Sequence, residues 1–199
     1  MKLKSLALAA LVLLSATCFA QTENTATGTP VNYGKTVLAI APLSLTEISK
    51  GVGLSYERAI DKEGIIALWI PVSFGFRTYD NSAYSSSTVY GNFYAMPGIK
   101  IYPTGSFGKC KYSIGPNLVF ATGNKSSDYN YYYYSGGETV SFLKMGFMVN
   151  NSLNINPLPH LYLGIDFGFG ITYLSEENNV SRNSTEGLVH FAFRIGYRN

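Results

Sequence analysis

Two segments near the C-terminus alternate strictly between large apolar side chains and small or polar ones. From Leu161 to Tyr173 every second residue is Leu, Ile, Phe or Tyr, and glycines with a few polar residues lie between them. From Val189 to Tyr197 the same alternation returns. A period of two predicts β-strands, because an α-helix would spread these apolar side chains around its whole circumference.

The two faces of these strands differ in a way that indicates contact with lipid. The apolar face is bulky, whereas the other face holds glycines together with Asp166, His190 and Arg194. A soluble β-sandwich would place bulky residues inside and long charged ones outside. A bulky apolar exterior around a small, polar interior is what a bilayer requires. We therefore expect an all-β protein, a closed antiparallel up-and-down transmembrane β-barrel of about eight strands.

Similar but less regular alternation recurs along the chain. Strands are expected at residues 36–45, 50–60, 65–77, 89–102, 110–122, 138–150, 160–174 and 187–198. Their lengths of about 10 to 14 residues suffice for a tilted membrane strand, which needs roughly 9–11. The turns expected on the periplasmic side are short, and three of the four outer connections are longer and polar, which is typical of outer-membrane barrels.

Four prolines fall inside the expected strands: Pro42, Pro71, Pro97 and Pro116. Proline cannot donate the backbone hydrogen bond that a closed barrel uses, so each should lie at a bulge or a strand end. Nothing around Pro71, in the middle of its strand, indicates which of the two applies there.

The N-terminus has the pattern of a secretory signal peptide. Two lysines precede an apolar run from Leu6 to Leu14, and Cys18 and Ala20 are small residues at the positions that cleavage requires. A lipid anchor on Cys18 is the alternative, although the residues before it make a poor lipidation signal. We expect a signal peptide at 1–20, a flexible N-terminal segment at 21–34 and the barrel at 35–199.

Charge and motifs give no reason to expect a nucleic acid or a cofactor. The chain has 15 Lys and Arg against 12 Asp and Glu, and loss of the two leader lysines leaves 13 against 12. The glycines alternate along strands and do not lead into a helix, so no phosphate-binding loop is expected. The only histidines are His160 and His190, without the spacing of metal ligands. We expect neither a cofactor nor a metal.

Two short motifs carry a family resemblance. The segment Gly53-Leu54-Ser55-Tyr56-Glu57-Arg58 resembles the second strand of small proteins of the outer membrane protein β-barrel domain type. The ending Phe193 to Arg198 looks like the C-terminal strand by which such proteins are recognised for membrane insertion, although this chain closes with Asn199 where the family usually has an aromatic residue. The resemblance implies an outer-membrane location, contact with its lipid and with the insertion machinery, and no catalytic residues.

Several charged residues fall on faces assigned to the interior. An eight-stranded barrel is just wide enough to be filled by its own side chains, so these charges should pair across the lumen. A plugging network is favoured over a gated polar path or ligand site, and a wide porin channel would need about twice as many strands. The residues are Glu57, Arg77, Lys100, Lys144, Asp166, His190 and Arg194, with Arg198 at the same parity.

A tyrosine cluster marks the third expected outer loop. Tyrosine combines a flat apolar face with a hydroxyl and suits contacts to sugars or proteins. The other interpretation places these residues in the aromatic girdle at the membrane surface. The cluster consists of Tyr129, Tyr131, Tyr132, Tyr133 and Tyr134.

The function expected from these features is a structural or surface-interaction role in the outer membrane, exercised through the extracellular loops toward an unidentified ligand. The alternatives are a narrow small-solute channel or an outer-membrane enzyme acting on lipids, and a soluble secreted β-sandwich. No GxSxG or comparable signature occurs, so no enzyme activity is expected.

Overall fold

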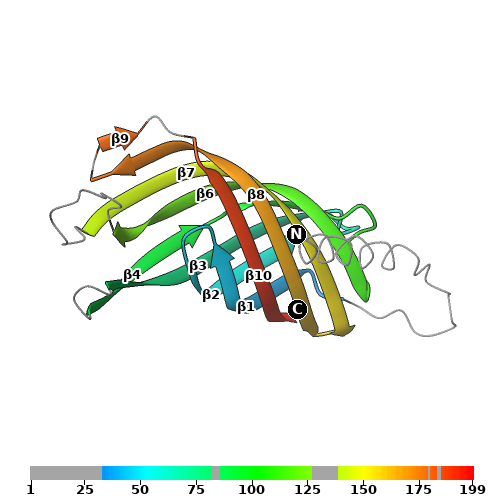
Figure 1. Cartoon of the computed structure of the whole chain (residues 1–199). Helices are drawn as coiled ribbons and strands as arrows, with labels where there is room; N and C mark the ends of the chain where they lie inside the picture. The colour runs from blue at the N-terminus through cyan, green and yellow to red at the C-terminus, as the bar shows by residue number, and fades with distance from the viewer. Residues whose placement is uncertain (1–32, 82–85, 127–138, 179, 183–184) are drawn as a thin grey trace, which may run out of the picture.

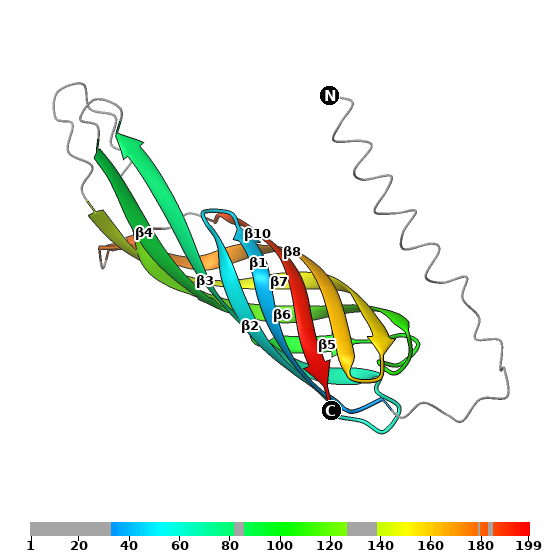
Figure 2. The same cartoon turned by 90° about the horizontal axis from the view of Figure 1, so that it is seen from below.

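The computed structural model describes residues 33–81, 86–126, 139–178, 180–182 and 185–199. In this part of the chain antiparallel strands form one sheet that closes on itself, because β10 pairs with both β1 and β8 (Figures 1 and 2). The expected closed, all-β barrel is confirmed, and the β-sandwich alternative is wrong. The strands are β1 Thr36–Thr46, β2 Lys50–Ala59, β3 Ile66–Asn81, β4 Ser86–Ala95, β5 Gly98–Ile101, β6 Cys110–Ser126, β7 Thr139–Leu158, β8 Leu161–Glu177, β9 Val180–Arg182 and β10 Gly187–Arg198.

The barrel wall has eight positions. β4 and β5 occupy one position in succession, because both lie between β3 and β6. β9 is a short strand that pairs with the end of β8. The described residues contain no helix that is long and apolar enough to cross a membrane.

The two ends of the barrel differ. The C-terminus and the turns after β2, β5 and β7 lie at one end, here called the inner end; the β1–β2 turn lies at the other, the outer end. Figure 2 shows β3 and β4 running well beyond the β1–β2 turn at the outer end. The strand lengths agree, since β3 has 16 residues and β7 has 20, against 11 in β1 and 10 in β2.

The four prolines lie where regular pairing is interrupted. Pro42 lies in a β1 bulge, where the register with both neighbours shifts. The Pro71 carbonyl accepts a hydrogen bond from the Met96 amide at 3.0 Å. Because N–H and C=O of a residue in an antiparallel strand point the same way, the Pro71 nitrogen faces the break between β4 and β5. Pro97 lies in that break. Pro116 lies between the two β5–β6 pairs, Gly98–Asn117 and Ile101–Ile114.

The outward face is apolar around the barrel. Leu38 is 59% exposed and Phe169 53%, whereas the inward Asp166 is 0% and Lys100 1% exposed. This arrangement is the inverse of that in a soluble protein. Exposing so much apolar surface to water is unfavourable, and a lipid bilayer that covers the surface removes this cost. Exposed large side chains include Leu38, Leu54, Phe74, Val89, Ile99, Leu118, Phe147, Phe169 and Val189, from β1 to β8 and β10.

The inner turn after β2 is held by Asp61. Its carboxylate accepts hydrogen bonds from the Ile65 amide at 2.9 Å and the Ile66 amide at 2.8 Å. These bonds lower the pKa of Asp61 below its ordinary value. Gly64 completes the turn with a φ of 70°, in the left-handed region that glycine adopts without strain.

Candidate functional site

Four charged side chains meet in the middle of the lumen. Arg194 of β10 donates to both carboxylate oxygens of Asp166 of β8, with Nη2 2.7 Å from Oδ1. Lys100 of β5 lies 3.0 Å from Glu57 of β2 and 3.5 Å from Asp166. Arg194 Nη1 lies 3.8 Å from Glu57, so the two pairs are linked. The cluster is electrically neutral, as a group buried this completely must be.

Aromatic and polar side chains complete this central network. Trp69 lies under both cations, with Lys100 Nζ 4.3 Å and the Arg194 guanidinium 5.1 Å from its ring centre. Tyr102 donates to Glu57, and Ser152 donates to Asp166. Cation–π contacts and charge-assisted hydrogen bonds offset the desolvation of the buried charges.

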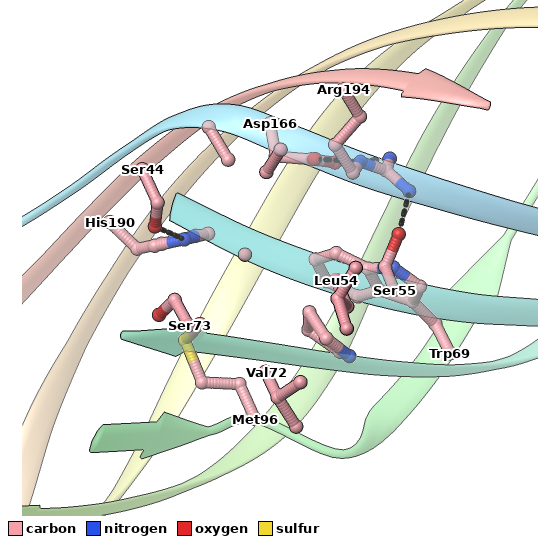
Figure 3. Close-up of a pocket in the computed structure, with 14 residues that line it drawn as sticks. Ser44, Leu54, Ser55, Trp69, Val72, Ser73, Met96, Asp166, His190 and Arg194 are labelled. Carbon is pink, nitrogen blue, oxygen red and sulfur yellow. Dashed lines mark hydrogen bonds and ion pairs between the residues drawn. The ribbon is translucent and has the colours of Figure 1, made fainter. Parts of the chain in front are cut away.

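A small cavity adjoins the central network on its outer side (Figure 3). His190 lies on its wall, with Nε2 3.4 Å from the Ser44 hydroxyl. Asp166 and Arg194 also line the cavity, as Figure 3 shows. The cavity measures about 10 Å³, room for about one water molecule. It is a packing gap between lumen side chains.

The β1–β2 turn folds into the outer part of the lumen. Ile48 packs against a buried apolar cluster that includes Tyr94 and Phe142. Glu47 accepts a hydrogen bond from Tyr94 at 3.1 Å and lies 4.0 Å from Lys144, which also pairs with Glu186 at 2.5 Å. Burial, the largest effect, raises the pKa of Glu47, although its backbone amide, Lys144 and Tyr94 act in the opposite direction.

The turn after β5 closes the inner end. Ser106 and Gly108 are buried there, and their carbonyls accept hydrogen bonds from Arg198 at 2.9 Å and Asn156 at 2.6 Å. The Ser106 amide donates to the carbonyl of Gly64 at 2.7 Å, which ties this turn to the one after β2. The lumen is therefore filled at three levels: the outer turn, the central network and the inner turn.

The structure places most of the charges predicted for the interior in the lumen, but in separate groups. Glu57, Lys100, Asp166 and Arg194 form the central network, His190 lies next to it, Lys144 lies at the outer turn and Arg198 at the inner turn.

The interior position predicted for Arg77 is wrong: its side chain is exposed. Its parity is inward, but it lies in the part of β3 that runs beyond the β1–β2 turn, where β2 no longer faces it. The tyrosine cluster at 129 and 131–134, the signal peptide and most of the flexible segment lie outside the described residues.

The sequence-based site lacked the aromatic residues Trp69, Tyr102 and Tyr162. Trp69 and Tyr162 have the inward parity of β3 and β8, and Tyr102 directly follows β5. Each of the three is at most 1% exposed. Inward parity together with a side chain too large for a glycine-lined lumen is the signal that could have found them. Among the described residues, no group of three His, Cys, Asp or Glu side chains is placed to hold a metal ion.

No protein-family model and no curated protein matches the chain. Solved structures do. A major outer membrane protein from Thermus thermophilus is 12% identical, with a TM-score of 0.57 over 84% of this chain and 100% of that one. The N-terminal β-barrel domain of Pseudomonas aeruginosa OprF is 7% identical, with a TM-score of 0.54 over the same shares.

Ail, the attachment invasion locus protein of Yersinia pestis, is a third similar structure, solved in complex with the heparin analogue sucrose octasulfate. It is 13% identical, with a TM-score of 0.53 over 84% of this chain and 100% of Ail. At these identities the likeness shows the fold. That fold and the apolar exterior together define the class: a small, eight-stranded outer-membrane β-barrel protein.

Proposed function

We propose that this protein is a sealed outer-membrane barrel. It serves as a structural element of the membrane and interacts with a surface ligand through its outer loops. The observation that carries the proposal is the filled lumen. The turns at both ends fold inward, and the central network of Glu57, Lys100, Asp166 and Arg194 crosses the space between them. Because the lumen is filled in this way, a ligand would bind on the outside of the molecule, as at the outer loops.

Conductance in planar lipid bilayers tests whether the barrel is sealed. Purified protein is expected to give no stepwise current, whereas a porin of about sixteen strands, reconstituted in parallel, provides the positive control. Regular current steps from the purified protein would favour the alternative of a narrow small-solute channel. The other alternative, a lipid-acting enzyme, gains no support from the lumen, where Glu57 and Asp166 are both tied to cations.

A surface-interaction role is supported by Ail, which is named for attachment and was solved with a heparin analogue. The tyrosine cluster at 129 and 131–134 is the proposed contact in this chain. Protein in lipid nanodiscs would be tested on immobilised heparin, with Tyr131 to Tyr134 replaced by serine as the variant. Loss of binding with an unchanged barrel supports the role. Unchanged binding with lowered barrel stability would instead assign the tyrosines to the membrane girdle.

The C-terminal strand is the proposed contact with the insertion machinery. β10 ends in Phe193-Arg194-Ile195-Gly196-Tyr197-Arg198, which alternates between outward aromatic or aliphatic residues and inward ones. Outer-membrane lipid is the partner of the apolar exterior.

A further inference from the structure

A groove lies on the lipid-facing side of the wall formed by β10, β1, β2 and β3. Its volume is about 520 Å³, within the range of sites that hold a small organic ligand. Its sides are the outward side chains of Leu38, Ile40, Leu54, Ile70 and Ile195, and no carboxylate lines it. The shape and chemistry suit a flexible hydrocarbon chain.

An exposed arginine, Arg58, lies at the inner end of this groove. Arg58 follows Tyr56, a groove residue, by two positions along β2, so both side chains leave the same outward face about 7 Å apart. Arg58 is exposed, and its side chain forms no ion pair or hydrogen bond with the described residues. Lys35, also exposed, is next to Thr36, the β1 residue that pairs with Arg58.

The height of Arg58 corresponds to the membrane surface. Leu38, which lies one outward position from Thr36 on β1, pairs with Tyr197 of β10. Tyr197 stacks on His160 of the turn after β7, with ring centres 5.4 Å apart. Tyrosine and histidine at the end of an apolar wall mark the headgroup region, where an outward arginine can reach phosphates.

We propose that this groove binds one phospholipid of the inner leaflet, with an acyl chain along the groove and the headgroup phosphate on Arg58. A guanidinium offers paired donors that match a phosphate, and an unpaired arginine on a lipid-facing wall needs such an anion. A second copy of the chain fits less well. A two-fold contact through this face would place the grooves of two copies against each other. Neither groove has a carboxylate that could pair with the Arg58 of the other copy.

Native mass spectrometry of the delipidated protein in detergent, titrated with dioleoyl phosphatidylglycerol, tests this site. Wild-type protein is expected to retain one lipid, and Arg58→Gln to bind it about tenfold more weakly through loss of a charge-assisted contact. Ile40→Trp, which fills the groove without adding charge, should also weaken retention. Arg77→Gln, at an exposed arginine far from the groove, is the matched control and should bind as the wild type does.

Two further probes separate the sources of the affinity. Dioleoylglycerol has the same chains without the phosphate and should bind weakly, and inorganic phosphate should not displace the bound lipid. Equal retention by Arg58→Gln and wild type, equal loss in Arg77→Gln, or displacement by inorganic phosphate would each overturn the proposal. A heat-dependent gel shift of every variant establishes that its barrel has folded, so a lost site is distinguished from a lost fold.

Discussion

At the scale of single residues, the molecule depends on matching the charges that are buried in its lumen. Arg194 is 1% exposed and contacts both carboxylates of the central network, so its removal leaves Lys100 facing two anions. An uncompensated buried charge costs far more than an exposed ion pair contributes.

Arg194→Met is therefore expected to lower the free energy of unfolding by about 3–5 kcal/mol. The double variant Arg194→Met with Asp166→Leu restores the balance between Lys100 and Glu57 and should recover much of the loss. Urea unfolding in lipid vesicles provides the measurement, with Arg77→Met as the exposed control. A double variant less stable than Arg194→Met alone would contradict this account of the network.

Asp61 gives a pH-dependent prediction outside the membrane. The amides of Ile65 and Ile66 stabilise its charged form, so its folded pKa lies below the ordinary value of 3.8. The stabilisation is complete above the unfolded pKa and is lost as the pH falls through the folded one. The Ile65 and Ile66 amide resonances, followed by NMR in micelles, should titrate together with a midpoint below 3.8. A midpoint at or above that value would rule out these hydrogen bonds.

The residues of the lumen were predictable only in part. Alternation shows which face a side chain occupies, and this was enough to find Glu57, Lys100, Asp166 and Arg194. It does not show which residues on distant strands lie at the same height, because that depends on the strand tilt and register of the closed barrel. Arg77 illustrates the limit, since its parity is inward but β3 has passed the β1–β2 turn there.

At the scale of strands, the barrel tolerates prolines because each coincides with an interruption in pairing. Pro71 faces the gap between β4 and β5, which the sequence does not mark because the gap belongs to the neighbouring strand. The expected strand at 89–102 is divided by that gap. The strand expected at 138–150 is much longer in the structure. β7 continues past its asparagines as far as Leu158, with a register shift against β8 between Ile155 and Leu158.

Proline position therefore predicts a contrast between two variants. Pro71→Ala should change the free energy of unfolding by less than about 1 kcal/mol, since its nitrogen faces a break. Leu118→Pro removes the donor of a 2.9 Å bond to the Pro97 carbonyl and should cost about 1–3 kcal/mol. Urea midpoints in vesicles compare the two. Equal destabilisation would mean that the β4–β5 gap does not accommodate Pro71.

At the scale of the whole molecule, an apolar wall, a neutral lumen network and two inward turns describe a closed cylinder with its apolar side chains outside and its charges inside. The β1–β10 pairing joins the first strand to the last, so in the described residues the sheet closes around the barrel and leaves free edges only where strands run past their neighbours at the outer end. This closure distinguishes the barrel from a β-sandwich, and its apolar outward face distinguishes it from a soluble barrel.

Gel electrophoresis of detergent-extracted membranes, with and without boiling, tests this closure directly. A closed barrel resists the detergent, so the unboiled protein should migrate faster than the boiled protein, as one compact band. Recovery of the protein in the soluble fraction, with the same migration before and after boiling, would contradict the closed membrane barrel.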